Sequence, residues 1–392
     1  MRTRFTFHKA ISLVCFVAFI FMCFVHEGYS QTQTEQSISL KEQQEGRTLM
    51  VAASTLYGLS LYGPGTALIL DLESGSQFAG LELLIGGGSF AGALAATRNH
   101  RLGVGRTNLI LSGSLAGTLY GFAVPVLFES ENEKAYFASA MLATPIGGLI
   151  AHRLTDHRWF KKGESYLMTN GGFVGGFYGF AIPYVANIEN LEEWTQAKIY
   201  VASIMAGVPI GTWATTKLIY NKPINEGRSH LISFGGLVGS AYAIGITSLM
   251  DVEAPRPYVF ATMVGLPVGT YLGYNLTAKG EYTAGRAALI QIGAYAGALF
   301  GNGAVLLTEA ESHKPYVIAG ILGSAAGMWF AHYSTRGWGE KTPFTRNDLI
   351  PKSDRFAVSL PSIDKWLTLG LMTFHKPTVM ANFPVELLRI SF

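Results

Sequence analysis

Charged residues and cysteine are both scarce in this sequence. Asp, Glu, Lys and Arg make up 14% of its 392 residues, whereas soluble domains carry roughly a quarter. Both cysteines, Cys15 and Cys23, lie in an N-terminal apolar run. A disordered chain is excluded, because such chains are rich in charge and poor in apolar residues. A scaffold built on disulfides is excluded, because no cysteine follows that run.

Motifs for catalysis and for nucleic-acid binding are missing as well. The patterns G-x-S-x-G, H-E-x-x-H and C-x-x-C do not occur. A net charge of +3 is too small to indicate nucleic-acid binding. Histidines lie among arginines and aromatic residues near expected helix ends, so we interpret them as interfacial and not as metal ligands. These are His100, His152, His157 and His332. We therefore expect a non-enzymatic protein without a metal or cofactor.

Residues 1–30 have the layout of a secretory signal peptide. They begin with basic residues, continue with an apolar stretch over 10–25 and end on Gly28-Tyr29-Ser30. Cleavage after Ser30 would leave a mature chain without cysteine, beginning with a polar linker over 31–46. An uncleaved membrane anchor is the alternative, because the apolar stretch is close to the shortest length that spans a bilayer.

Five copies of one unit follow the linker. Each copy opens on a glycine and a charged residue, and successive openings are 59, 58, 64 and 58 residues apart. The openings are Gly46-Arg47, Gly105-Arg106, Gly163-Glu164, Gly227-Arg228 and Gly285-Arg286. A period of this size is the signature of a repeat domain. We place it over 47–339, with units 47–104, 105–162, 163–226, 227–284 and 285–339.

Glycine recurs at a fixed place in each half of the unit. In the first half it stands eleven residues past the charged position, at Gly58, Gly117, Gly175, Gly239 and Gly297. Three residues further along stand Leu61, Tyr120, Tyr178, Tyr242 and Phe300. In the second half the glycine follows a tyrosine by eleven residues, at Gly147, Gly211, Gly269 and Gly327. These glycines are our candidate packing residues.

The pattern around the glycines favours helices over strands. Small and large residues alternate in adjacent pairs, as in Gly171-Gly172 followed by Phe173-Val174. A strand would put both kinds on both faces, whereas a helix collects small residues on one side. We predict an all-α fold of about ten glycine-rich apolar helices, paired as five hairpins through close backbone contact. A small β-rich tail is expected over 340–392, and an outer-membrane β-barrel with a helix-like pattern is the alternative.

Proline supports buried helices. Pro145, Pro209 and Pro267 each lie midway along a second helix, where a water-exposed helix would lose about 3 kcal/mol. Helices among neighbours or in lipid tolerate proline better, because local partners satisfy the freed backbone groups.

Eight segments of membrane-spanning length carry no Asp, Glu, Lys or Arg. They are 107–128, 135–152, 165–188, 199–216, 229–250, 257–278, 287–308 and 315–335. Helices apolar all round lie in a large core or in lipid, and this number favours lipid. Connectors inside the hairpins are acidic, and those between hairpins are basic.

The connectors and the signal peptide give conflicting indications of which membrane holds the chain, the inner or the outer. Basic connectors should face the cytoplasm, but a cleaved signal peptide would place the acidic ones there. The chain ends on a weakly alternating segment, 385–392, whose last residue is Phe392. It resembles the closing strand of outer-membrane barrels or is an edge strand that ends on Phe by chance. We expect an exported protein of the cell envelope, and favour the outer membrane.

Polar residues inside the expected helices are the remaining candidates for function. They are Glu82, Asn170, Gln291 and Asn302. A carboxylate inside a membrane suggests function, whereas the amides are expected to form hydrogen bonds between helices. Because these groups occur in single units, we expect a membrane or envelope scaffold, with a channel or transporter as the alternative. Expected partners are membrane lipid and, for assembly, another copy or an envelope protein.

Overall fold

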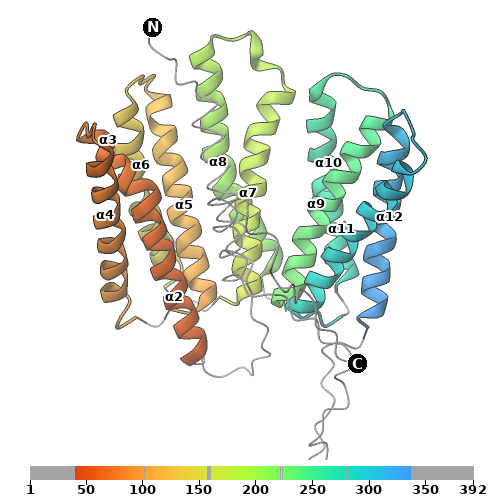
Figure 1. Cartoon of the computed structure of the whole chain (residues 1–392), viewed down its shortest axis with the longest axis horizontal. Helices are drawn as coiled ribbons and strands as arrows, with labels where there is room; N and C mark the ends of the chain where they lie inside the picture. Colours follow the sequence, from red (N-terminus) through yellow and green to blue (C-terminus); the bar gives the residue numbers. More distant parts are fainter. Residues whose placement is uncertain are drawn as a thin grey trace, which may run out of the picture. The chain divides into compact units, whose positions relative to one another are not determined.

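The computed structural model describes residues 40–100, 102–156, 160–220, 222, 224–278 and 280–336. Within these ranges every regular element is helical (Figure 1), which confirms the predicted all-α class for this part of the chain. The expected signal peptide and the expected strands of the tail lie outside the described residues. The chain divides into two compact units, Met1–Gly339 and Glu340–Phe392, and the helices belong to the first.

Consecutive helices pair as hairpins. The first hairpin joins α2 (Leu40–Tyr57), continued by a π-helical turn (Gly58–Tyr62) and α3 (Gly63–Ile69), to α4 (Gly75–Ala96). The others pair α5 (Val104–Leu127) with α6 (Glu133–Leu154), α7 (Lys162–Val185) with α8 (Glu193–Ile219), α9 (Glu226–Leu249) with α10 (Pro255–Leu276), and α11 (Ala284–Leu306) with α12 (Lys314–Ser334). A 3₁₀ turn, Ile188–Asn190, lies between α7 and α8.

The two helices of a hairpin meet backbone to backbone. A Cβ atom added to Gly175 would lie 2.0 Å from the carbonyl oxygen of Gly207, and one on Gly211 would lie 2.1 Å from that of Gly171. Such distances leave no room for a side chain, so the helices approach this closely only because glycine lines both. The same main-chain contact recurs at Gly117, Gly147, Gly239, Gly269, Gly297 and Gly327. At Gly58 the added atom meets the side chain of Ser89 instead, at 2.5 Å.

The hairpins stack in chain order. Their first helices form a row in which α2 contacts α5, α5 contacts α7, α7 contacts α9, and α9 contacts α11. The second helices α8, α10 and α12 each pack on their own first helix and on the first helix of the preceding hairpin, while α6 reaches back to α3. In the described part of the chain, the end helices α2 and α11 share no contact. The hairpins therefore form an open array held by nearest-neighbour contacts.

Candidate membrane surface and hairpin contacts

The described residues contain six helices long and apolar enough to cross a membrane. They are Gly75–Ala96, Val104–Leu127, Glu133–Leu154, Glu193–Ile219, Glu226–Leu249 and Ala284–Leu306. Large apolar side chains stand exposed on them, among them Leu84 at 75%, Trp213 at 63% and Leu299 at 74%. Soluble monomers rarely expose apolar surface on this scale. The chain is therefore a membrane protein. Five of the six helices cover charge-free segments predicted from the sequence, whereas Gly75–Ala96 contains Glu82 and was not among those segments. The predicted segments 165–188, 257–278 and 315–335 do not fall in these six helices.

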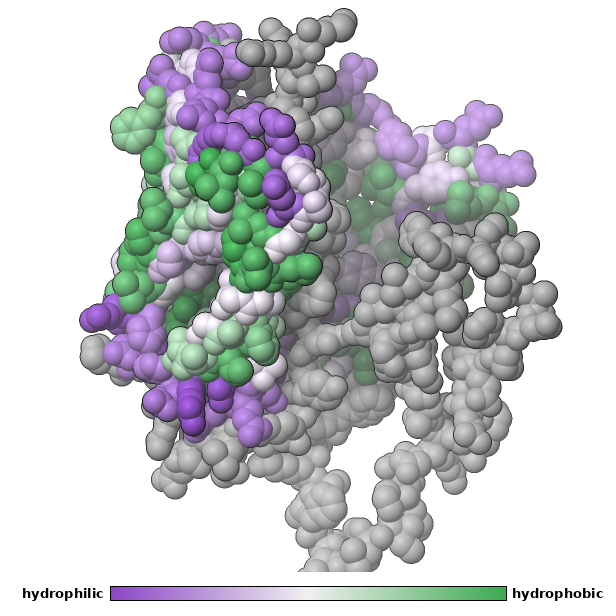
Figure 2. All heavy atoms as spheres, turned by 60° about the vertical axis from the view of Figure 1, so that its left-hand side comes forward, coloured by the Kyte–Doolittle hydropathy of each residue, from purple (hydrophilic) through white to green (hydrophobic). Residues whose placement is uncertain are grey.

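Polarity is distributed in bands along the helices. The view in Figure 2 shows apolar residues over the middle of one face and hydrophilic residues above and below them. The acidic connectors of the hairpins lie at one end of the helices, and the basic connectors between hairpins lie at the other. This order, polar then apolar then polar, matches that of a bilayer.

A glycine contact joins successive units at the basic end. The glycine that opens a unit lies against the connector that precedes the first helix of the next unit. A Cβ atom on Gly105 would lie 2.0 Å from the carbonyl oxygen of Phe160, and one on Gly227 would lie 2.2 Å from that of Tyr282. Gly46 and Gly163 meet Leu102 and Asn225 in the same way. The last of these glycines, Gly285, has no neighbour within 4 Å among the described residues.

A tyrosine contact joins successive hairpins at mid-helix. The hydroxyl group of Tyr120 on α5 donates a hydrogen bond of 2.8 Å to the carbonyl oxygen of Met205 on α8. Met205 stands four residues before Pro209, which has no N–H to bond that carbonyl within the helix. The tyrosine of one hairpin thus satisfies the acceptor that proline frees in the next.

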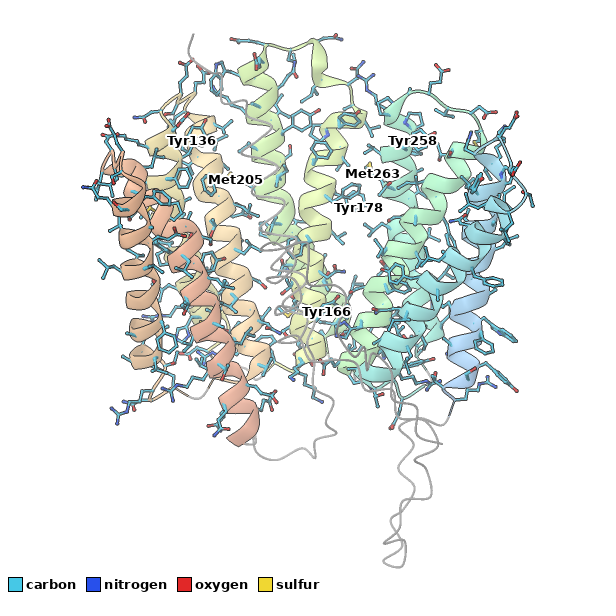
Figure 3. All side chains as sticks on the ribbon, in the orientation of Figure 1. Tyr136, Tyr166, Tyr178, Met205, Tyr258 and Met263 are labelled. Atoms are coloured by element: carbon cyan, nitrogen blue, oxygen red, sulfur yellow. The ribbon has the colours of Figure 1, made fainter. Side chains whose placement is uncertain are left out.

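The same contact occurs at the two neighbouring interfaces. Tyr62 donates to the carbonyl oxygen of Met141, four residues before Pro145, at 2.9 Å. Tyr178 donates to that of Met263, four residues before Pro267. In Figure 3, Tyr178 on α7 and Met263 on α10 lie close together between the two helices. The proline pattern predicted that neighbours would satisfy the freed carbonyl groups, but not which residue would do so.

The last interface departs from this pattern. Ala325 stands where a proline would be expected in α12, so the helix keeps its own hydrogen bond. Tyr242 of α9 accordingly pairs with the hydroxyl group of Ser324, at 2.7 Å. The final copy of the tyrosine position is Phe300, which is 83% exposed, and the described residues contain no later hairpin for it to contact.

An ionic contact joins successive hairpins at the acidic end. Each first helix is followed by a residue with a positive φ between 51° and 60°, namely Asp71, Glu129, Asn187, Asp251 and Glu309. Lys134 pairs with Asp71, Lys198 with Glu129 and Lys314 with Asp251, each at 2.5 Å. At the remaining interface Arg256 donates to the side-chain oxygen of Asn187 at 2.5 Å. In every case the basic residue belongs to the hairpin that follows.

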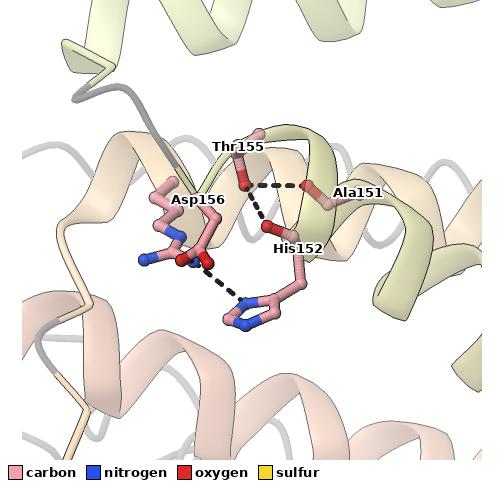
Figure 4. Close-up of polar contacts among 5 residues, drawn as sticks. Ala151, His152, Thr155 and Asp156 are labelled. Carbon is pink, nitrogen blue, oxygen red and sulfur yellow. Dashed lines mark hydrogen bonds and ion pairs between the residues drawn. The ribbon is translucent and has the colours of Figure 1, made fainter.

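Arginines close the basic end of the hairpins. Arg106 at the start of α5 pairs with Asp156 and lies 3.3 Å from Nδ1 of His152, both at the end of α6. Beside them the Thr155 hydroxyl donates to the carbonyl oxygens of Ala151 and His152, at 2.7 and 3.2 Å (Figure 4). A cation at a helix C-terminus is favoured by the helix dipole, so this cluster supports the helix end.

A longer-range ion pair crosses the basic end. Lys162, the first residue of α7, lies 3.2 Å from the carboxylate of Glu45 on α2. Burial raises the pKa of the nearby Glu42 carboxyl above its usual value, and Lys162 partly opposes that rise. The first and third hairpins are thereby linked near the ends of their first helices.

The four polar candidates from the sequence do not share a site. Glu82 lies on α4, where its Cγ atom would be 3.0 Å from a Cβ added to Gly63. Asn170 is half-buried on α7. Gln291 and Asn302 both lie on α11, but eleven residues apart, or about 16 Å along a helix. The three helices that carry these groups, α4, α7 and α11, share no contact with one another.

The two amides of α11 have different surroundings. The Gln291 side chain donates a hydrogen bond of 3.4 Å to the carbonyl oxygen of His230 on α9. The side-chain oxygen of Asn302 is buried without a hydrogen-bond partner. No cluster of three or more His, Cys, Asp or Glu residues suited to a metal occurs in the described ranges.

Comparisons with known proteins add no relative to this description. No protein-family model, no curated protein and no solved structure matches the chain. Its class is therefore defined by its own fold as an α-helical membrane protein of stacked glycine-rich hairpins.

Proposed function

We propose that this protein is a non-enzymatic scaffold in a membrane of the cell envelope, to which its N-terminal segment directs it. The observation that carries the proposal is the repetition of the glycine, tyrosine and ionic contacts between successive hairpins. The hydroxyl groups of Tyr62, Tyr120 and Tyr178 join hairpins, and large apolar side chains are left exposed on the outer surfaces. A rigid array of this kind suits anchoring in lipid and presenting connectors to partners.

The polar connectors are the parts available to an envelope protein or to another copy. At the acidic end each connector presents exposed carboxylates, such as Glu131 beside α6. At the basic end Arg98 is exposed after α4. Because the two ends have opposite charge, the partners on the two sides of the membrane would differ in charge as well.

A labelling experiment tests the membrane-spanning part of the proposal. Single cysteines would replace Glu131 and Arg98, both exposed, in a chain whose Cys15 and Cys23 are changed to serine. We expect a membrane-impermeant maleimide to label one site only from outside intact cells, and both after permeabilisation. Equal labelling of both sites in intact cells would contradict spanning hairpins.

A flux experiment separates the scaffold from a channel or transporter. A pathway needs polar groups from several hairpins at one place, whereas the four candidates lie apart. An ion-sensitive dye is entrapped in proteoliposomes of the purified chain and in liposomes without protein. We expect the dye signal to stay equally constant in both when an ion gradient is applied. Protein-dependent ion flux that scales with the amount of protein would overturn the scaffold.

A further inference from the structure

An apolar groove opens between the last two hairpins. It has a volume of about 430 Å³ and is lined by α9, α11 and α12, a size typical of small-ligand sites. On α9 its lining extends from Phe234 to Gly245, which is about 16 Å of helix. Leu237 and Tyr295 at its margin are 56% and 55% exposed. The groove is therefore open to the medium around the helices.

Three residues of the groove lining are smaller or more polar than their counterparts in the third unit. Ala241 takes the place that Phe177 has in the third unit, and Asn302 takes that of Phe180. Gly320 on α12 takes the place of Ile204 on α8. Each of these residues brings less side-chain volume or less apolar character to the interface between the last two hairpins.

One polar acceptor in the lining has no partner. Tyr242 and Ser324 bond each other at 2.7 Å. The side-chain oxygen of Asn302, by contrast, is buried and accepts no hydrogen bond. A buried unpaired acceptor costs about 1–3 kcal/mol. Asn302 stands four residues before the end of α11, about 6 Å from it, which is close to the interfacial level of a bilayer.

We propose that this groove binds one acyl chain of a membrane lipid whose interfacial group donates a hydrogen bond to Asn302. The inference rests on the membrane setting of the proposed function. The groove opens at an apolar surface of the helices, which faces lipid in a membrane. A lipid acyl chain is therefore the molecule that has direct access to the groove. The apolar lining accommodates the chain, while a hydroxyl or amide N–H group supplies the donor that Oδ1 lacks. A diester lipid offers only acceptors at that level.

Photolabelling of the full chain in phosphatidylcholine vesicles tests the proposal. Two probes carry the same diazirine acyl chain, one as a ceramide with hydroxyl and N–H donors and one as a diester phosphatidylcholine. We expect the ceramide probe to label peptides from the groove of α11 and α12 more strongly than the diester does. The preference should disappear in Asn302→Leu, which removes the acceptor and keeps a similar volume.

Filling the groove provides the second arm. Ala241→Phe restores the side chain found at the equivalent position 177, so the fold should accept it. We expect this substitution to lower the labelling of the groove by about tenfold, which corresponds to a tenfold weaker affinity for the probe. Ala296→Phe is the matched control, because Ala296 is exposed on α11 outside the groove lining. It should leave groove labelling unchanged.

The outcomes separate this inference from the proposed function. Label spread evenly over all exposed helix faces would overturn the groove site but leave the membrane setting intact. Absence of label from every helix would overturn the membrane setting itself. Equal groove labelling by both probes would overturn the role of Asn302. A groove that neither probe labels, while other exposed helix faces are labelled, would overturn the lipid as its occupant.

Discussion

The Tyr120 hydroxyl donates a 2.8 Å hydrogen bond to the Met205 carbonyl oxygen, which Pro209 leaves without its helical partner. A bond between one hairpin and the next thus compensates a defect within a helix. Tyr62 and Tyr178 make the same bond to Met141 and Met263. The proline is tolerated because the neighbouring hairpin is present, so helix integrity and stacking are coupled.

The tyrosine–proline relationship predicts a strong coupling between two substitutions. Tyr120→Phe should destabilise the chain by about 1–3 kcal/mol, because a part-buried carbonyl group loses its donor. In a Pro209→Ala background the same change should cost less, since the new backbone N–H at position 209 bonds the Met205 carbonyl oxygen within the helix. Thermal unfolding of the four variants in detergent measures the coupling.

A conservative change elsewhere provides the control for that cycle. Tyr271→Phe alters a side chain that is 67% exposed on α10, and should shift the unfolding free energy by less than about 0.5 kcal/mol. An equal cost of Tyr120→Phe with proline or alanine at position 209 would contradict the assigned role of the bond.

The glycine face within hairpins predicts that an added methyl group is harmful at one site and harmless at another. A Cβ atom on Gly239 would lie 2.3 Å from the carbonyl oxygen of Gly265, so Gly239→Ala should cost about 1–3 kcal/mol through overpacking. Gly303→Ala places its methyl group where no described residue lies within 4 Å, and should be neutral or stabilising. Similar unfolding temperatures for both variants would refute close backbone contact.

The glycine that opens each unit is predicted to stabilise the stacking of the next unit on its own. Gly227→Ala should weaken the stacking of the fifth hairpin on the fourth, because its methyl group would meet the carbonyl oxygen of Tyr282 at 2.2 Å. Gly285→Ala should not, because the described residues contain no neighbour within 4 Å of it. Limited proteolysis after residue 278, compared between the two variants, reports the loosening. Faster cleavage in Gly285→Ala than in Gly227→Ala would contradict the role of Gly227 in stacking the fifth hairpin on the fourth.

The ionic contacts at the acidic end should contribute little to stability. The side chains of Lys134 and Asp71 are 40% and 73% exposed, and exposed pairs contribute about 0–1 kcal/mol. Lys134→Met should therefore lower the unfolding free energy by less than about 1 kcal/mol at low salt. The effect should vanish at 1 M salt, where the screening length is about 3 Å. A larger effect that persists in salt would indicate a desolvated pair.

The first unit shows where sequence spacing misleads. Counting from the charged position aligns Leu61 with Tyr120, but Tyr62 is the residue that donates to the next hairpin. The π-helical turn Gly58–Tyr62 takes up one extra residue, so the later side chain occupies the position that the count gave to the earlier one. A count assumes a constant helical period, and a π-bulge breaks it.

The sequence by itself determined the helices and their setting. Paired small residues select a helix over a strand because the two structures distribute side chains with different periods. Charge-free segments of spanning length select a membrane because uncompensated charge is costly in lipid. Both inferences depend only on the local order of residues along the chain.

Only the tertiary structure decided which groups meet between hairpins. Tyr120 and Met205 are 85 residues apart, and Gly105 meets the carbonyl oxygen of Phe160 across a whole unit. The sequence repeat showed that these residues recur at fixed spacing. The spacing is the same whether a recurring residue contacts its own hairpin or the next one, so it does not identify the partner. The stacking order resolves that ambiguity, because it fixes which carbonyl groups lie within hydrogen-bond reach of each donor.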